Sequence, residues 1–452
     1  GGLDRTYVRS PPWIGWPGIG LDPSGRGRHL GRVWRTGEQG MRHTRATEGL
    51  VLVGNASDDP FAIDLAYAIG QTVDIADLIS LKVFANGEFC PRFISDERQL
   101  HGIGYTLEGR TVVIVSTATP TLTRQELAMR TLLIARAARE NGAAHVVLVE
   151  PDLYFSAQDR GPRPELGMPG ADRDLKDLKK FDGQPFSSKL YAELLRTAGI
   201  DRVITVHNHS DAVQELYARQ FEGHFHNLLP TELFADYLRE SDIVDFGPKG
   251  EGLALCAPDE GAREFVEHLR AELDLPAARS VLLHKERSGE REVEVCVHRD
   301  SESRLEDLAD HDVVLVDDMV RTGSTVVEAC ELLRRGSPRR VVFGVSHFYA
   351  SEEGRQKMAS SALDEILTLN TLPTVLNRDV QGRLRRKMVV LKIEHWLARN
   401  LAEILDLPLA SVSDGLYQID MSSKNPRFRR KIWSSEELPS LRAEAHETHA
   451  AG

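Results

Sequence analysis

Residues 313–325 read VVLVDDMVRTGST, an apolar run followed by two carboxylates, a short polar loop and three hydroxyl side chains. The apolar run predicts a buried strand, and the loop leads into a helix that begins near residue 324. In open α/β sheets ligands bind at the carboxyl ends of strands, and a helix N-terminus favours a phosphate. The segment therefore predicts a ribose 5-phosphate site in which Asp317 and Asp318 contact ribose hydroxyls. A buried strand with an ordinary acidic cap is the alternative.

The residues of the loop suit an anion for three different reasons. Arg321 carries a charge that does not titrate in the physiological range. Gly323 lets the backbone approach a ligand closely. The remaining hydroxyl groups donate hydrogen bonds, and they belong to Thr322, Ser324 and Thr325.

Apolar runs alternate with amphipathic segments from about residue 48 onward. We expect strands at 49–55, 110–120, 144–153, 201–209, 253–258, 280–285, 312–318, 339–347 and 387–393. Helical spacing of apolar residues predicts helices at 123–143, 187–200 and 324–336. The alternation predicts an α/β fold with two doubly wound, mostly parallel-sheet domains in tandem.

The ends of the chain differ from its centre. Residues 1–47 are rich in Gly, Pro, Arg and Trp, and the first methionine is Met41, so we expect a disordered or non-native extension there. We divide the remainder into an N-terminal α/β domain at 48–222, a C-terminal α/β domain at 223–410 and a tail at 411–452.

Composition excludes several classes of protein. The net charge of −12 disfavours a generic nucleic-acid binder. No apolar run reaches the roughly 18 residues that a membrane span requires, so we expect no membrane partner. The four cysteines are scattered and lack metal-ligand spacing, which is typical of reduced thiols. No signal-peptide pattern is present, and we expect a cytoplasmic location.

The segment VVLVDDMVRTGST resembles the ribose-phosphate loop of the phosphoribosyltransferase fold. Other segments resemble, in order and spacing, the ribose-phosphate pyrophosphokinase (PRPP synthetase) family, which makes phosphoribosyl pyrophosphate. They are FANGE (84–88), AQDR (157–160), VITVHNHSD (203–211), CAPDEGAR (256–263) and LLHKERSGERE (282–292). The resemblance covers about residues 48–410 and implies a divergent member with two phosphoribosyltransferase-type domains.

The resemblance also implies roles for particular residues. FANGE and AQDR are similar to segments that bind ATP, through Phe84, Asn86, Gly87, Glu88, Gln158 and Asp159. The resemblance implies that His209 helps to hold the Mg²⁺–ATP complex and that Asp259 binds the metal, and Mg²⁺ favours such oxygen ligands as the carboxylate. Lys285 and Arg287 are similar to the pair that contacts the transferred group. The alternatives are a structural histidine and a solvated charge run.

The activity that the resemblance implies is transfer of the diphosphoryl group of ATP to the 1-hydroxyl of ribose 5-phosphate, which yields PRPP and AMP. The family further implies a homo-oligomer, a dimer or a hexamer. Three positions depart from the family pattern, with Ala157 in place of an arginine and His207 and Arg321 in place of aspartates. Two alternatives therefore stay open, a non-catalytic regulatory relative of active synthetases and a phosphoribosyltransferase that consumes PRPP.

Overall fold

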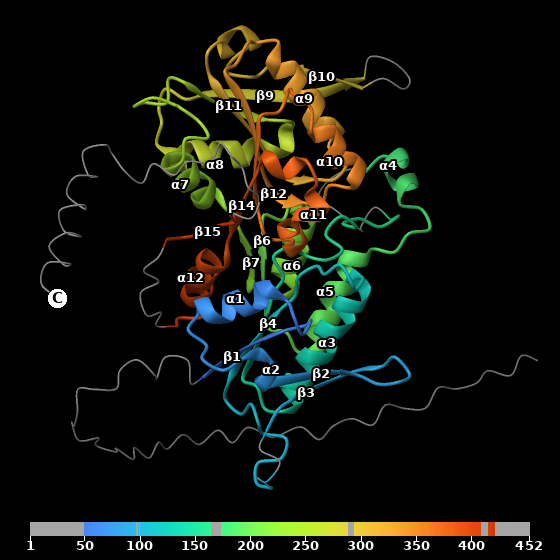
Figure 1. The fold of residues 1–452 in the computed structure, drawn as a ribbon. Coiled ribbons are helices and arrows are strands. Elements are labelled where there is room, and N and C mark those ends of the chain that lie inside the picture. Colours follow the sequence, from blue (N-terminus) through green and yellow to red (C-terminus); the bar gives the residue numbers. More distant parts are fainter. Residues whose placement is uncertain are drawn as a thin grey trace, which may run out of the picture. The chain divides into compact units, whose positions relative to one another are not determined.

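The computed structural model describes residues 49–95, 98, 100–163, 173–287, 293–407 and 415–420. The predicted extension at 1–47 lies outside these residues. The described part contains two mostly parallel sheets and one two-stranded sheet, with helices packed around them (Figure 1). The predicted α/β fold with two mostly parallel sheets in tandem is confirmed. No helix in the described part is both long and apolar enough to cross a lipid bilayer.

The first sheet consists of five parallel strands. In spatial order they are β1 (Leu50–Gly54), β4 (Thr111–Val115), β5 (His145–Val149), β6 (Arg202–Val206) and β7 (Phe225–Leu228). The helices in this part of the chain are α1 (Pro60–Ala68), α2 (Ile75–Leu78), α3 (Arg124–Glu140), α4 (Leu175–Lys180), α5 (Ser187–Ala198) and α6 (Asp211–Gln220). Strand β7 extends the sheet beyond residue 222, where the sequence-based division ends the first domain. Its four residues are only half-buried, so no apolar run marks it.

A hairpin of β2 (Ile79–Val83) and β3 (Phe89–Phe93) forms the two-stranded sheet. Its turn holds the FANGE segment at residues 84–88. The ring of Phe89 packs under the guanidinium of Arg130, with Cζ 4.6 Å from the ring centroid. The hairpin therefore rests on α3 of the first sheet.

The second sheet has eight strands. In spatial order they are β10 (Val293–Val297), β9 (Arg279–Arg287), β8 (Leu253–Ala257), β11 (Asp312–Val320), β12 (Arg340–Phe348), β13 (Glu365–Leu369), β14 (Met388–Lys392) and β15 (Gln418–Ile419). Only the outermost pairs, β10 with β9 and β14 with β15, are antiparallel. Strand β15 lies within the predicted tail, which thus contributes to the sheet.

The remaining helices belong to the second half of the chain. The α-helices are α7 (Thr231–Glu240), α8 (Arg263–Leu273), α9 (Ser324–Arg334), α10 (Glu352–Met358), α11 (Arg378–Gln381) and α12 (Glu394–Ile404). Short 3₁₀ helices lie at η1 (Glu260–Ala262), η2 (Leu305–Leu308), η3 (Pro373–Leu376) and η4 (Leu384–Arg386).

The strand order of the second sheet reverses between β8 and β11. Strand β8 pairs with β9 on one side and with β11 on the other, and the later strands continue outward from β11. Such a reversal opens a crevice at the carboxyl ends of the two strands, where ligands of open α/β sheets bind. Asp259 follows β8, and Asp317 and Asp318 lie on β11, so the topology brings these three carboxylates to one crevice.

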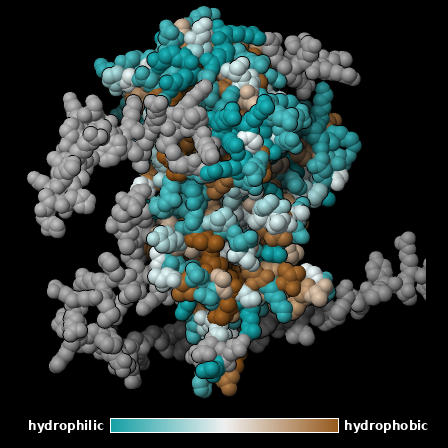
Figure 2. Space-filling model, viewed as in Figure 1, coloured by the Kyte–Doolittle hydropathy of each residue, from teal (hydrophilic) through white to brown (hydrophobic). Residues whose placement is uncertain are grey.

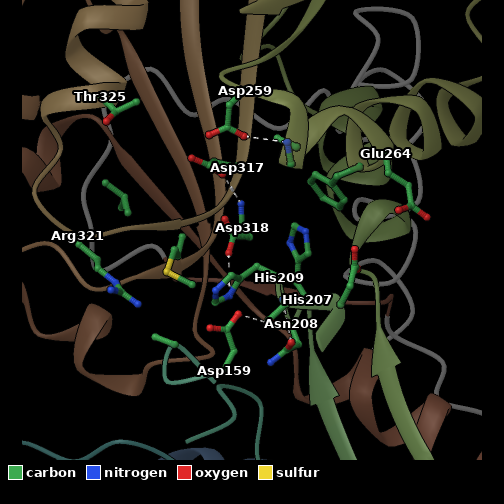
Figure 3. Close-up of a pocket in the computed structure, with 18 of the residues that line it drawn as sticks. Asp159, His207, Asn208, His209, Asp259, Glu264, Asp317, Asp318, Arg321 and Thr325 are labelled. Atoms are coloured by element: carbon green, nitrogen blue, oxygen red, sulfur yellow. Dashed lines mark hydrogen bonds and ion pairs between the residues drawn. The ribbon is translucent and has the colours of Figure 1, made fainter. Parts of the chain in front are cut away.

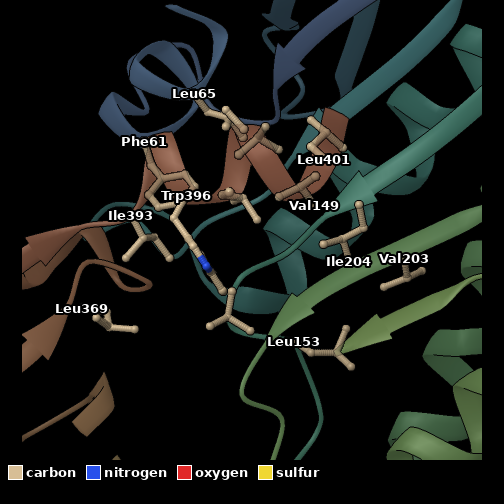
Figure 4. Packing of buried hydrophobic residues seen from close by; sticks show 14 of the residues in the cluster. Phe61, Leu65, Val149, Leu153, Val203, Ile204, Leu369, Ile393, Trp396 and Leu401 are labelled. Atoms are coloured by element: carbon tan, nitrogen blue, oxygen red, sulfur yellow. The ribbon is translucent and has the colours of Figure 1, made fainter. Parts of the chain in front are cut away.

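The hydrophobic core joins the two sheets. Side chains of β11 alternate, with Val314 and Val316 in a cluster shared with the first sheet and Val313 and Leu315 in a second cluster with α9. This is the two-residue period of a strand that is buried on both faces. Figure 4 shows Trp396 of α12 near α1 and the strands of the first sheet. A helix from the end of the described chain therefore completes the core at its beginning.

Candidate active site

A cavity of about 850 Å³ lies where the carboxyl ends of β6, β8 and β11 meet. Its lining includes residues 207–212 after β6, Asp259 after β8, and Asp317 to Gly323 from the end of β11 into α9. Figure 3 shows the carboxylates of Asp259, Asp317 and Asp318 facing this cavity together with the ring of His209. Site residues that the sequence predicted separately in the two halves of the chain thus line one cavity.

The two adjacent aspartates lie within β11, which extends two residues beyond the predicted strand at 312–318. The strand continues to Val320, because it pairs with β12 up to Phe348. The amide of Asp318 donates to Oδ1 of Asp317 at 2.9 Å. Burial, together with the charges of Asp318 and Asp259, raises the pKa of Asp317 well above its usual range. The site thus concentrates negative charge in a place where water is partly excluded.

His209 is the basic side chain nearest this charge. Its Nδ1 lies 3.4 Å from Oδ2 of Asp318. That buried oxygen accepts no hydrogen bond from the described residues. A buried carboxylate oxygen without a donor is costly to leave unpaired, so this atom is positioned to receive a cation or a ligand hydroxyl.

The predicted phosphate loop lines the opposite part of the cavity through Arg321, Thr322, Gly323 and Thr325. Gly323 has φ of +72°, and a Cβ atom there would lie 2.9 Å from Cγ of Met358. Both the backbone conformation and the close contact require glycine. Ser324 does not line the cavity, and its hydroxyl accepts a hydrogen bond from Nζ of Lys357 at 3.1 Å. The prediction of a direct role for Ser324 is therefore not supported by its location.

Arg321 is exposed and faces the cavity (Figure 3). Its Cζ lies 5.9 Å from the ring centroid of Tyr349, within the range of a cation–π contact. No carboxylate pairs with Arg321 in the described part of the chain. Its charge is therefore available to an anionic ligand.

The residues predicted to bind ATP are divided between two places. Asp159 lines the cavity, where Ser210 Oγ donates to its Oδ2 at 2.8 Å and Arg160 Nε lies 3.2 Å from its Oδ1. Gln158 is exposed and does not line the cavity. The FANGE residues are exposed at the β2–β3 turn and also do not line it; they are Phe84, Asn86, Gly87 and Glu88.

Lys285 lines the cavity from β9 and is exposed. Arg287 is the last residue of β9 and pairs with Val293, but its side chain lies outside the described part of the structure. The predicted loop continues through residues 288–292, which are also not described. The geometry thus supports a site role for Lys285 and leaves Arg287 a prediction.

His207 was identified in the sequence only as a departure from the family pattern. It is buried, and burial lowers its pKa to about 3, so the ring is neutral at physiological pH. Its Nδ1 lies 2.6 Å from Ser346 Oγ, and its ring lies 4.2 Å from that of Phe265. An aspartate here would bring a further negative charge beside Asp318. Sequence reasoning could not find this role, because Ser346 is 139 residues away.

The predicted metal ligands, His209 and Asp259, line the same cavity. The described residues contain no group of three side chains arranged to hold a metal ion by themselves. Mg²⁺ is usually bound by one or two carboxylates together with substrate phosphates and water. The carboxylate of Asp259 fits that mode of binding, as does Oδ2 of Asp318, which accepts no hydrogen bond from the described residues.

Comparison with known proteins agrees with this geometry. A family model described as "Phosphoribosyl transferase domain" matches residues 238–374. The ribose-phosphate pyrophosphokinase of Corynebacterium efficiens is 27% identical over 345 residues, which cover 76% of this chain and 90% of the relative. Ribose-phosphate pyrophosphokinase 4 of Saccharomyces cerevisiae is 29% identical over 286 residues, with coverage of 62% and 75%.

A solved structure shares the fold. The phosphoribosylpyrophosphate synthetase of Mycobacterium smegmatis aligns with a TM-score of 0.59 and 23% identity, over 79% of this chain and 99% of that one. The chain is a divergent relative of the ribose-phosphate pyrophosphokinases, with a phosphoribosyltransferase-type fold. The region matched by the family model includes Asp259, Lys285 and the loop at 321–325. It does not include His209 or FANGE, which lie in the first half.

The raised pKa of Asp317 predicts a pH-dependent stability. A carboxyl group whose pKa is higher in the folded than in the unfolded state stabilises the fold below the unfolded pKa of about 3.9, and that contribution is lost as pH rises toward the folded value. Asp317→Asn cannot ionise. The free energy of unfolding of this variant, relative to that of the wild-type protein, should therefore be higher at pH 8 than at pH 5. Urea denaturation at both pH values measures this.

The exposed Asp74, whose side chain makes no capping bond, provides the matched control. Asp74→Asn should leave the pH dependence of stability as it is in the wild-type protein. An identical pH dependence in Asp317→Asn and wild type would contradict the raised pKa.

Proposed function

We propose that this protein transfers the diphosphoryl group of ATP to the 1-hydroxyl of ribose 5-phosphate and forms PRPP and AMP for nucleotide biosynthesis. One observation carries the proposal. The residues that line one cavity come from four separate strand ends, and they are His209, Asp259, Lys285, the segment 317–323 and Thr325. The names of the relatives support the same activity, since they are called ribose-phosphate pyrophosphokinases.

The second-sheet side of the cavity would bind ribose 5-phosphate. Backbone amides at the start of α9, together with Thr322 and Thr325, suit the 5-phosphate. Arg321 adds a planar charged group that can bind phosphate through two parallel hydrogen bonds. Asp317 and Asp318 would then accept hydrogen bonds from ribose hydroxyls and orient the 1-hydroxyl toward ATP.

The first-sheet side would bind ATP through Asp159 and neighbouring residues. The FANGE turn does not line the cavity of its own chain, so a second copy would be needed to bring Phe84 to the adenine. Figure 2 shows hydrophobic atoms on the surface of the first-sheet half. Apolar side chains exposed there include Met129 and Leu133 of α3 and Leu190 and Leu194 of α5. These features support the proposal of a homo-oligomer, a dimer or a hexamer.

The catalytic problem is the negative charge on the triphosphate as the ribose oxygen attacks the β-phosphorus. Lys285, with Arg287 two residues later, would stabilise that charge as it develops. The cavity holds the two substrates in line, which removes much of the entropic barrier. No covalent intermediate is required. Catalysis would therefore come from positioning and electrostatics.

Mg²⁺ belongs to this proposal as a cofactor. Asp259, Asp318 and His209 are the residues that would hold it, directly or through water, beside the phosphates of ATP. When bound it would neutralise triphosphate charge. Burial and the neighbouring charges of Asp318 and Asp259 raise the pKa of Asp317, and this concentration of carboxylates supports the proposal of a cation here.

A non-catalytic regulatory relative is the second candidate. Ala157 lacks the cation that the family pattern has beside the nucleotide, and Arg160 is already paired with Asp159 and Asp177. Lys285 in the cavity favours the enzyme. A phosphoribosyltransferase that consumes PRPP would account for the second sheet but gives no role to Asp159 and His209 of the first. The expectation of a cytoplasmic location stays a prediction.

One assay tests the function. The purified protein with ATP, ribose 5-phosphate and Mg²⁺ should form AMP and PRPP in a 1:1 ratio, and chelation of Mg²⁺ by EDTA should abolish both. Chromatography of the nucleotides together with enzymatic determination of PRPP measures the ratio. Release of ADP would instead indicate a simple kinase, and absence of turnover would favour the regulatory relative.

Lys285→Ala should lower kcat by roughly 10²-fold or more and change each KM much less. The reason is that a cation acting on developing charge stabilises the transition state more than bound substrate. Steady-state kinetics with each substrate varied in turn measures this. Lys179→Ala, at an exposed lysine of α4, is the matched control. Near wild-type turnover of Lys285→Ala would identify this lysine as a solvated surface charge.

Arg321→Asp should raise the KM for ribose 5-phosphate and leave the KM for ATP nearly unchanged. Reversal of charge beside the 5-phosphate should cost on the order of 1–3 kcal/mol, the range of charge-assisted hydrogen bonds. Arg299→Asp, at an arginine whose side chain is 89% exposed, controls for the change in net charge. An unchanged or lower KM for ribose 5-phosphate would refute the role assigned to Arg321.

A further inference from the structure

Tyr349 lies directly after β12, beside the phosphate loop, and joins the two halves of the chain. Its ring is in contact with the guanidinium groups of Arg321, at 5.9 Å, and of Arg124, at 5.3 Å from Cζ to the centroid. Its hydroxyl donates a hydrogen bond to Asp152, and Arg124 forms an ion pair with the same carboxylate. One tyrosine thus connects the loop that holds Arg321 to α3 and to the end of β5.

Buried groups of the first half hold the side chain of Tyr349 in place. The side chain of Asp152 is only 6% exposed, and its two oxygens bind Tyr349 and Arg124 separately. Arg124 also contacts the ring of Tyr154, at 5.0 Å. Burial and the neighbouring Asp152 raise the pKa of Tyr349, so its hydroxyl stays protonated and remains a donor. The ring is therefore held in one orientation by groups of the first half.

The backbone of the phosphate loop is held by the segment that begins at Tyr349. The amide of Tyr349 donates to the carbonyl of Val320 at 3.0 Å, and the amide of Ser351 donates to that of Arg321 at 3.2 Å. A Cβ atom on Gly354 would lie 2.9 Å from the Arg321 carbonyl oxygen. These contacts fix the Arg321 backbone. For its side chain, the ring of Tyr349 is the contact that the described residues provide.

We propose that Tyr349 is a positioning residue for Arg321, which it holds toward the cavity in the conformation that binds a phosphate monoester. The inference rests on the proposed function, since it takes ribose 5-phosphate as the ligand of Arg321. A long arginine side chain loses conformational freedom when it binds an anion, and a ring that restricts it beforehand reduces this loss. Tyr349 itself does not contact the reacting atoms.

The alternative to a positioning role is that Tyr349 has a purely structural role. The tyrosine joins the two halves through Asp152, so its loss could disturb the cavity as a whole. A general disturbance would weaken the binding of ATP as well as that of ribose 5-phosphate, and it would do so whether or not Arg321 is present. A positioning role acts only through Arg321. A double-mutant cycle separates the two, because it isolates the interaction between the two side chains.

The experiment is isothermal titration of ribose 5-phosphate and, separately, of a non-hydrolysable ATP analogue with Mg²⁺. The proteins are wild type, Tyr349→Leu, Tyr349→Phe, Arg321→Ala and the two double variants. Tyr349→Leu should raise the Kd for ribose 5-phosphate about three- to tenfold, as expected for loss of a cation–π contact, and leave the Kd for the ATP analogue unchanged. In the Arg321→Ala background the same change should have no further effect. Tyr67→Leu, at a tyrosine of α1 that is 81% exposed, is the matched control.

Tyr349→Phe keeps the ring but removes the hydrogen bond to Asp152, and it covers the case in which Tyr349→Leu does not fold. This variant should raise the Kd for ribose 5-phosphate about twofold, again only when Arg321 is present. Equal losses in both backgrounds, or a parallel loss of ATP binding, would overturn the positioning role. Binding without turnover by the wild-type protein would refute the proposed catalytic function alone. Absence of ribose 5-phosphate binding by the wild-type protein would overturn both.

Discussion

The constraint on which the site depends is the partial burial of two adjacent carboxylates on β11. Asp317 and Asp318 follow four residues that are fully covered on both faces of the sheet, and they continue the same ladder. Asp259 reaches the same crevice because the strand order reverses between β8 and β11. Like charges held this close oppose ionisation of one another. The arrangement is stable at neutral pH only if a proton, a cation or hydrogen-bond donors compensate it, and a ligand can supply the last two.

The residues around the carboxylates can be understood from the need to compensate this negative charge. His209 provides the nearest basic group to Asp318. His207, two residues earlier, is kept neutral by burial and adds no charge of either sign. It is hydrogen-bonded to Ser346, and His347 on the same strand is hydrogen-bonded to the carbonyl of Val206. The two halves are thus joined by polar contacts directly beside the acidic centre. The pair of His209 and Asp318 adds a contact between the two halves inside the cavity itself.

Much of this arrangement follows from the sequence, and the exceptions have physical reasons. Buried strands such as 313–316 were predictable because a short unbroken apolar run is typical of a strand that is buried on both faces. The hairpin at 79–93 was not, because its exposed strands lack an apolar period. The resemblance indicated what FANGE binds in the family, yet it could not indicate that this turn lies outside the cavity of its own chain. The pairing of Tyr349 with Asp152 spans 197 residues and depends on the packing of two sheets.

The departures at Ala157 and Arg321 can be considered together as a redistribution of charge. On the nucleotide side, the cation of the family pattern is missing, and the neighbouring Arg160 is shared between Asp159 and Asp177. On the proposed ribose-phosphate side, Arg321 stands where the resemblance implies an aspartate, and it pairs with no acid among the described residues. Removal of an acid beside a phosphate and addition of a base act in the same direction, so the phosphate side becomes more positive by two charges. Under the proposed function, the triphosphate side would by contrast depend more heavily on Lys285 and on a divalent cation. The balance between the two substrates is therefore where this chain should differ most from its relatives.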